Sequence, residues 1–202
     1  MIPITYGNIL AVFFKATDLE TINGADWYHA ANHAAQITAA RYNVTLDTAA
    51  GVIAALSPNN RWERNLVDAD SMIRAYSMGG HDAADLAKVG TYNANKVKAL
   101  AILSGDDCLK VLGGLKVRAF YDCIIGGDSV CIDGHAYAIW TGGYIPTTKT
   151  PKISPKTYHA ISADYRLAAA TINSILQAEY SAAQIQAITW LVWRRITKEG
   201  NK

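Results

Sequence analysis

Asp133 is the acidic residue whose surroundings most favour a catalytic role. It follows a short apolar run, residues 130–132, and stands immediately before a predicted helix that begins at Gly134. A carboxylate held beside a reacting carbon can stabilise positive charge there or activate an incoming water or amine. Asp133 can also cap the helix by accepting hydrogen bonds from its first N–H groups. The two roles are compatible, because a cap fixes the carboxylate's surroundings.

Lys116 lies seventeen residues before Asp133, at the start of a helix that a glycine turn opens and a Gly-Gly pair closes. As a neutral amine, this lysine could attack an electrophilic carbon and form a Schiff base. It could equally contact an anion. The turn glycines, Gly113 and Gly114, would let the backbone approach an anion closely and bind it through exposed N–H groups.

Two segments in this order resemble motifs of the helix-hairpin-helix DNA glycosylase superfamily. Residues 114–117, Gly-Leu-Lys-Val, are similar to the end of that family's hairpin, and residues 132–135, Ile-Asp-Gly-His, are similar to its Asp-x-His segment. The hairpin is shorter here, since Gly113 and Gly114 stand where the family usually has Pro-Gly-Val-Gly. The compact size and the Trp-rich C-terminus resemble small phage-encoded members of the group.

The resemblance implies roles for individual residues. Asp133 would stabilise the sugar cation, and Lys116 would be the catalytic amine of a lyase or a phosphate contact. His135 would orient the loop of the acid or contact a phosphate. The hairpin glycines Gly113 and Gly114 would bind the DNA backbone. Some members carry a four-cysteine iron–sulfur cluster near the C-terminus, and the absence of any cysteine after Cys131 implies that this cluster is missing.

A second polar stretch, residues 59–62, has the composition of a base-flipping wedge. An enzyme that acts on a base inside a duplex must first flip the nucleotide out, and another group then fills the gap. Asn59 and Asn60 can donate to and accept from the orphaned base, and Arg61 and Trp62 follow them. Trp62 could stack on a base or cover the core. The simpler interpretation is an ordinary Pro-Asn-Asn turn, but the matching order of the other elements favours the wedge.

Lys96 precedes the hairpin on a predicted helix, in a segment similar to a lysine-bearing stretch of the glycosylase family. Lys96 and its neighbour Lys98 could contact phosphates. The alternative is a solvated helix face, which such charges usually form.

Metal and cofactor binding are not favoured by the sequence. His29 and His33 have the i, i+4 spacing that can bind a metal, but no third ligand lies nearby, so a surface or interface pair is the better interpretation. The three cysteines form neither a CxxC pair nor an even set, which indicates reduced thiols. We expect no cofactor.

The composition is that of a folded protein with a sizeable core. Of 202 residues, 50% are hydrophobic and 18% are charged, and the formal net charge is +2. This charge is too small to indicate nucleic-acid binding by itself, although a local basic patch is compatible with it. No run of eighteen apolar residues occurs. We expect a cytoplasmic monomer without a membrane segment, located in the bacterial host cell if phage-encoded, with double-stranded DNA as its partner.

The residue pattern predicts an all-α protein. Prolines are rare, strand signals are weak, and apolar residues recur at three- and four-residue steps. The predicted helices cover residues 9–15, 27–42 after Gly24 or Asp26, 48–56 capped by Asp47, 62–77 ended by Gly79-Gly80, 82–89, 96–103, 107–111 capped by Asp106, 164–179, and 182–197 opened by a Ser181/Gln184 capping box. Ser154 and Pro155 mark a further helix start.

The resemblance implies one glycosylase-like unit, residues 1–202, with two helical lobes and the active site between them. One lobe would comprise about 45–110, and the other would comprise 1–44 with 111–202, including the hairpin, the catalytic acid and the C-terminal helices. The implied function is that of a DNA glycosylase that flips a damaged or modified base and cleaves its N-glycosidic bond, with or without a lyase activity. The alternatives are a phage enzyme that hypermodifies thymine on the same scaffold, a transferase or pyrophosphorylase, and a non-catalytic DNA-binding module.

Overall fold

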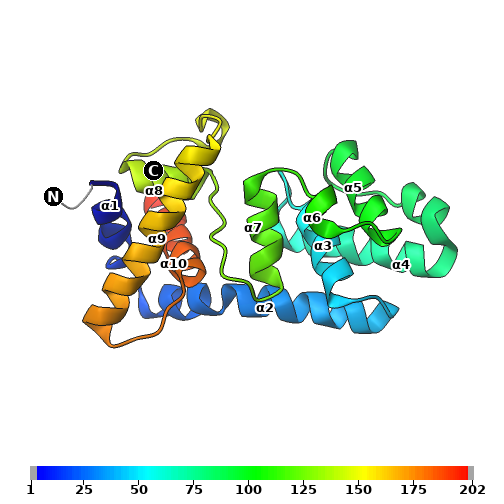
Figure 1. The fold of residues 1–202 in the computed structure, drawn as a ribbon, viewed down its shortest axis with the longest axis horizontal. Coiled ribbons are helices and arrows are strands. Elements are labelled where there is room, and N and C mark those ends of the chain that lie inside the picture. Colours follow the sequence, from blue (N-terminus) through cyan, green and yellow to red (C-terminus); the bar gives the residue numbers. More distant parts are fainter. Residues whose placement is uncertain (1–3, 200–202) are drawn as a thin grey trace. The chain divides into compact units, whose positions relative to one another are not determined.

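The computed structural model describes residues 4–199, and all regular secondary structure in that range is helical (Figure 1). The all-α prediction is therefore confirmed for the described residues. No helix in that range is long and apolar enough to span a membrane. The helices are α1 (Ile4–Phe13), α2 (Asp18–Tyr42), α3 (Leu46–Leu56), α4 (Trp62–Leu86), α5 (Asn93–Leu103), α6 (Cys108–Val111), α7 (Leu115–Ile124), α8 (Gly134–Thr141), α9 (Pro155–Leu176) and α10 (Ala182–Glu199), with a 3-10 turn, η1 (Thr147–Lys149), before α9.

The chain forms two compact units, and their boundaries differ from the predicted lobes. One unit, the terminal unit, runs up to Tyr28 and resumes at Asp128, and the other, the central unit, is His29–Gly127. Residues 29–44 and 111–127 therefore belong to the central unit. The reason is a long-range contact, because α7 packs on α3. In addition, Arg41 and Tyr42 at the end of α2 bind Asp70 of α4 at 2.7 and 3.0 Å.

Helix α3 forms the core of the central unit. Every residue from Ala49 to Leu56 is buried, and α4, α5 and α7 pack around it. Its N-cap is Thr45, whose hydroxyl accepts from the Thr48 N–H at 3.0 Å. The predicted cap, Asp47, lies inside the first turn and accepts the phenol proton of Tyr121 instead. A side chain two residues inside the helix does not replace the N-cap, whose side chain accepts from the N–H groups of the first turn.

The break predicted at Gly79 and Gly80 is present in the structure. α4 continues to Leu86, but Gly79 and Gly80 leave helical geometry, with φ of +69° at Gly80, and this kink separates the two helices predicted on either side. α6 is capped by Asp107, which accepts from the Lys110 N–H at 2.9 Å, and not by Asp106.

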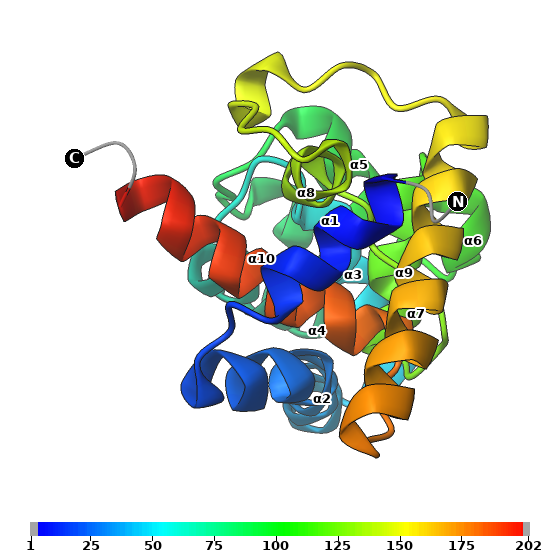
Figure 2. The ribbon, with the colours of Figure 1, turned by 90° about the vertical axis from the view of Figure 1, so that its left-hand side faces the viewer.

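The terminal unit contains α1, the first part of α2, α8, α9 and α10. Helix α1 contacts α8, α9 and α10 (Figure 2). α9 is one helix from Pro155, so the start signal at Ser154 and the predicted helix at 164–179 describe a single element. The capping box that opens α10 is confirmed, with reciprocal bonds between Ser181 and Gln184 at 2.8 and 3.1 Å.

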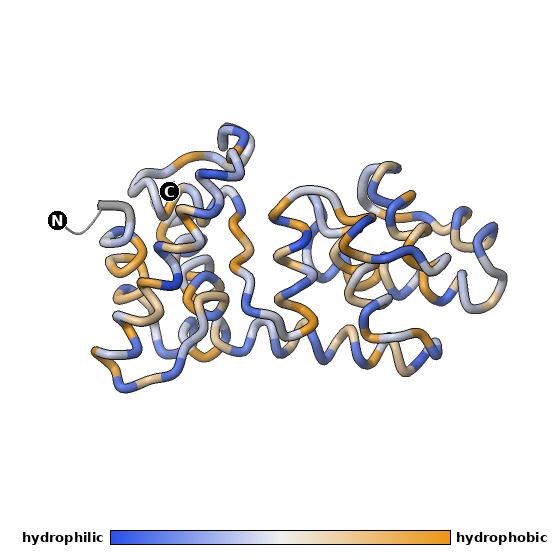
Figure 3. Tube along the Cα trace, in the orientation of Figure 1, coloured by the Kyte–Doolittle hydropathy of each residue, from blue (hydrophilic) through white to orange (hydrophobic). Residues whose placement is uncertain are grey.

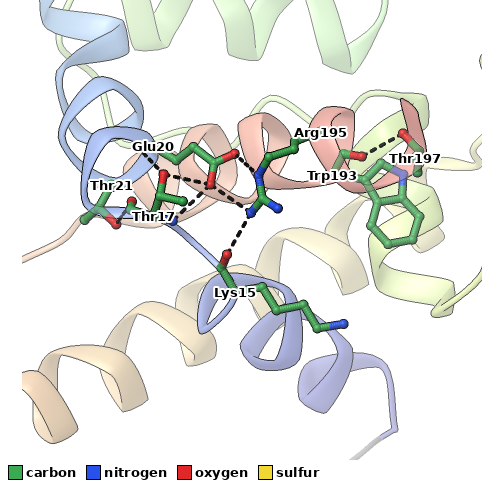
Figure 4. A network of polar contacts seen from close by, with 7 residues as sticks. All are labelled: Lys15, Thr17, Glu20, Thr21, Trp193, Arg195 and Thr197. Atoms are coloured by element: carbon green, nitrogen blue, oxygen red, sulfur yellow. Dashed lines mark hydrogen bonds and ion pairs between the residues drawn. The ribbon is translucent and has the colours of Figure 1, made fainter. Parts of the chain in front are cut away.

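Helix α2 starts earlier than predicted. A capping box formed by Thr17 and Glu20 opens it, so Gly24 and Asp26 lie inside the helix. A Cβ on Gly24 would lie 2.5 Å from Cα of Ile188, which shows that this glycine serves a close approach of α2 and α10. Arg195 of α10 binds the Glu20 carboxylate of the α2 capping box, with Nε at 2.8 Å and a second nitrogen at 3.0 Å (Figure 4).

The Glu20–Arg195 pair makes the stability of the terminal unit dependent on pH. The hydrogen bond from Arg195 lowers the pKa of Glu20 below its ordinary value of 4.5. A lowered folded-state pKa adds stability that is fully present above the unfolded pKa and is lost as the pH falls through the folded value. Glu20→Gln should therefore cost about 1 kcal/mol at pH 7. The difference from wild type should shrink below about pH 4.5, as urea unfolding at several pH values would measure. A constant difference down to pH 3 would contradict the assignment.

Candidate active site

Asp133 is delivered by an extended, buried segment to the start of α8. Residues 130–132 are buried and form a hydrophobic stretch (Figure 3). Asp133 itself is half-buried and is the N-cap of α8, where Oδ1 accepts from the Ala136 N–H at 2.8 Å. The predicted cap is thus confirmed. In the described part of the chain the second carboxylate oxygen, Oδ2, has no hydrogen-bond partner.

Tyr158 of α9 holds the segment that leads to Asp133. Its phenol oxygen accepts from the Ile132 N–H at 3.1 Å and donates to the Val130 carbonyl at 2.8 Å. One buried hydroxyl therefore satisfies two backbone groups that have no strand partner, as buried polar groups require. The direction in which the chain enters α8 follows from these two bonds.

Tyr165 lies on α9 within electrostatic reach of Asp133. It is fully buried, and its hydroxyl is 3.4 Å from the hydroxyl of Thr189 on α10. Burial raises the pKa of Tyr165, and the negative charge of Asp133 raises it further. The phenol therefore stays protonated and uncharged.

An aromatic group surrounds His135, two residues after the acid. The His135 ring packs edge-on against Trp190 at 6.4 Å between centroids, and Trp190 packs against Trp27 at 6.5 Å. The Arg194 guanidinium lies 4.3 Å from the Trp190 ring centre, which is a cation–π contact. These tryptophans thus pack within the terminal unit, and Trp190 keeps part of its ring exposed.

Removing the Tyr158 hydroxyl should destabilise the terminal unit. Tyr158→Phe leaves the Ile132 N–H and the Val130 carbonyl buried without a partner, which should cost about 1–3 kcal/mol of unfolding free energy. Tyr144→Phe is the matched control, because Tyr144 is exposed, and it should change stability by less than about 0.5 kcal/mol. Urea unfolding of both variants compares them, and equal stabilities would show that the Tyr158 bonds are dispensable.

The hairpin of the central unit joins α6 to α7 through Leu112, Gly113 and Gly114. Gly114 is the N-cap of α7, with φ of +75°, and it offers no side-chain cap. The Arg118 Nε donates to the Leu112 carbonyl at 2.7 Å and so closes the turn from the α7 side. Both glycines are exposed. This geometry leaves the turn backbone accessible, as a phosphate contact would need.

The lysines near the hairpin have different surroundings. The Lys96 side chain is mostly buried, and its ammonium binds the carbonyl and the carboxylate of Asp85. The Lys98 ammonium lies 3.4 Å from the place where a Cβ of Gly113 would stand. Lys116 is exposed in the first turn of α7. The structure therefore places Lys98 and Lys116 at the hairpin and ties Lys96 to Asp85.

Alanine substitutions at the two hairpin glycines distinguish the stability cost of backbone strain from the cost of a steric contact. Gly114→Ala places a side chain at φ of +75° with no neighbour within 4 Å, so strain alone should cost about 1–3 kcal/mol. Gly113→Ala is the control, because its φ lies outside the left-handed region and its Cβ would meet only the mobile end of Lys98. Thermal or urea unfolding should leave Gly113→Ala within about 0.5 kcal/mol of wild type. Equal losses in both variants would contradict this account.

Asp68 organises the loop that carries the wedge candidates. This carboxylate is buried and accepts from the Asn60 Nδ2 at 2.9 Å, the Arg64 Nε at 2.7 Å and the Gly90 N–H at 2.7 Å. The Thr91 hydroxyl adds a bond to the Pro58 carbonyl at 3.0 Å. Asn60 is thus engaged in holding its own loop.

Asn59 is the wedge candidate that projects from this loop. It is exposed and adopts a left-handed φ of +57° at the turn, a conformation that asparagine tolerates better than most residues. Arg61 is exposed at the N-cap of α4 without a side-chain capping bond. Trp62 packs edge-on against Phe120 of α7 at 6.3 Å, so its ring covers the core. A turn and a wedge are both compatible with this arrangement.

No metal centre is visible in the described part of the chain. No group of three or more His, Cys, Asp or Glu side chains there is arranged to hold an ion. His29 and His33 are exposed on α2. All three cysteines are buried and outside any disulfide, and burial raises the pKa of Cys108 to about 11. A protonated, buried thiol is neither a good ligand nor a good nucleophile.

The candidate residues fall into one group per unit. Asn59, Asn60, Arg61, Trp62, Lys96, the hairpin glycines and Lys116 lie in the central unit, and Asp133 and His135 lie in the terminal unit. The class of protein is thus an all-helical, two-unit chain with a hairpin and a helix-capping acid. The chain belongs to a family of unknown function, DUF7178, whose model matches residues 4–197. Neither the curated proteins nor the solved structures contain a significant match.

Two residues of these sites carried no readable signal in the sequence. Tyr158 and Asp68 act through backbone groups that are 26 and 22 residues away along the chain, so local patterns do not reveal them. Lys96 and Lys98 were both phosphate-contact candidates in the sequence. Assigning the buried face of α5, which includes Ala99 and Leu103, is a signal that could have separated the two lysines.

Proposed function

We propose that this protein is a DNA base-excision glycosylase that flips a damaged or modified base and cleaves its N-glycosidic bond. The observation that carries the proposal is the Asp133 carboxylate. One oxygen is fixed by the first turn of α8, and the other has no partner in the described part of the chain. A carboxylate held in this way needs no rearrangement before it meets developing positive charge.

Hydrolysis of the N-glycosidic bond requires charge stabilisation at the sugar and one proton acceptor. As the glycosidic bond breaks, its electrons leave with the base and positive charge builds on the sugar, where an ionised Asp133 would stabilise it. Asp133 would then accept a proton from the attacking water, whose oxygen bonds to the sugar carbon. The leaving base gains a proton in exchange. No cofactor is needed for these steps.

The surroundings of the acid support a base-handling role. A flipped base is commonly stacked on aromatic side chains. The Trp190 ring of α10, which is not fully buried, is such a surface, and it packs against His135, two residues after Asp133. Asn59, at the apex of its loop, is the side chain we assign to the gap in the duplex.

Lys116 is the candidate for a lyase step. Attack by its neutral amine on the sugar carbon would displace the base, which takes one amine proton. The sugar ring would then open, with the second amine proton going to the ring oxygen, and leave a Schiff base that borohydride reduces to a stable protein–DNA bond. Lys116 is exposed, so a DNA complex would have to desolvate the amine. If Lys116 instead contacts a phosphate, no adduct forms, although binding weakens when it is replaced.

The first test compares wild type with Asp133→Asn. Asparagine caps a helix about as well as aspartate, so the variant should fold normally while the negative charge is lost. Release of free base from duplex DNA, including DNA from modified-base phages, should fall about 10²–10⁴-fold by mass spectrometry. DNA binding should change little. Asp107→Asn, the same change at the cap of α6, is the matched control and should keep its turnover.

Other outcomes separate the alternatives. A nucleotide altered within the strand, with no base released, would favour the enzyme that hypermodifies thymine. DNA binding without any product, unchanged in Asp133→Asn, would favour the non-catalytic module. Absence of DNA binding would refute all three functions. Trapping by borohydride that is lost in Lys116→Gln and kept in Lys110→Gln would add the lyase activity.

A further inference from the structure

The segment between α8 and α9, residues 144–156, carries basic side chains and no acidic ones. We call it the lysine loop. It contains Lys149, Lys152 and Lys156, and no acidic residue occurs anywhere from Gly134 to Ala163. The three lysines are exposed. The candidate site described above does not use them.

The charges of the lysine loop have no counter-charge in the described part of the chain. None of its three lysines forms an ion pair there, whereas Arg41, Arg64, Lys96 and Arg195 each pair with a carboxylate. The two acids that flank the loop along the chain are Asp133 and Asp164. Asp133 caps α8, and Asp164 accepts the indole N–H of Trp140 at 2.7 Å, so neither forms an ion pair with the loop.

The end of the loop adds further positive potential. Lys156 stands in the first turn of α9, a turn that contains no acidic residue. The amino end of a helix carries a partial positive charge, so acids are the usual residues there and a lysine is unfavourable without a nearby anion. An anion bound at this end would relieve that repulsion.

The backbone of the loop is restrained. Pro146, Pro151 and Pro155 each fix one φ angle, and η1 and the Ser154 cap order the segment between them. Restraint of this kind reduces the entropy lost when the loop binds a partner. The lysines are therefore presented on a framework with few conformations.

We propose that the lysine loop binds the phosphodiester backbone of duplex DNA. Its residue types are those of phosphate contacts, namely lysines with exposed hydroxyl groups such as Thr148 and Tyr144. Such contacts position a protein on DNA without reading its sequence. A lipid surface fits less well, because Ile145 and Ile153, the aliphatic side chains of the loop, are not exposed and cannot insert among acyl chains. The choice of DNA over other polyanions rests on the proposed function.

The test is the salt dependence of DNA binding by the full chain. The triple variant Lys149→Gln, Lys152→Gln, Lys156→Gln loses three phosphate contacts, and each contact contributes about 0.9 to the slope of log Kobs against log salt concentration. The slope should become shallower by about 2–3, and the Kd for a 20-base-pair duplex should rise about tenfold at 100 mM salt. Fluorescence anisotropy from 50 to 300 mM salt measures both.

A matched triple variant controls for net charge. Lys15→Gln, Lys88→Gln, Lys198→Gln removes three exposed lysines outside the loop and should keep the wild-type slope. Equal effects of the two triple variants would overturn the inference while leaving the proposed function intact. Wild-type protein that binds no DNA would overturn the proposed function and the inference together. Loop-dependent binding to anionic vesicles or to RNA, with no binding to duplex DNA, would overturn the assignment to DNA.

Discussion

The terminal unit depends on one buried hydroxyl. Residues 130–132 run through the interior as an isolated extended segment, and a segment without a neighbouring strand leaves its N–H and C=O groups unsatisfied. Tyr158 satisfies two of them at once, from Val130 and Ile132. The backbone before Asp133 is therefore fixed by a side chain of α9. The cap of α8 then fixes the Asp133 carboxylate itself.

The central unit solves a comparable problem with a carboxylate. The loop after α3 and the loop before α5 both lack regular structure, and the buried Asp68 binds a donor from each of them. Its pairing with the partly exposed Arg64 balances the charge. Burial of an acid is tolerated when it is both paired and fully hydrogen-bonded. In both units, then, irregular segments that carry candidate functional residues are fixed by one polar side chain from a long helix.

Local signals in the sequence predicted where several helices start. Long-range contacts determine the boundaries of the two units. The caps at Asp133 and Ser154 and the capping box at Ser181 were readable, because each involves residues three positions apart. The boundaries of the units were not readable. They depend on α7 packing against α3 and on the bonds from Arg41 and Tyr42 to Asp70, which cross 28 residues or more.

The start of α2 illustrates the same limit at a smaller scale. Gly24 was interpreted as a residue that precedes the helix, yet it lies inside α2. A glycine is needed there because α10 passes too close for any side chain. The reason for a glycine at position 24 is visible only when the packing against Ile188 of α10 is known. The resemblance to the glycosylase superfamily likewise rests on short segments, and the family model that covers the chain carries no function with it.

The Gly90 amide should give a distinctive NMR signal. Its proton points at a buried carboxylate 2.7 Å away, in a loop that otherwise contains few backbone bonds. An amide hydrogen-bonded to an anion is strongly deshielded, so this single glycine supplies a distinctive signal in a nitrogen–proton spectrum. Because the same carboxylate holds Asn60, that signal would respond when the neighbouring loop is displaced. The protein thus contains its own reporter for the state of the Asn59 turn, with no label attached near it.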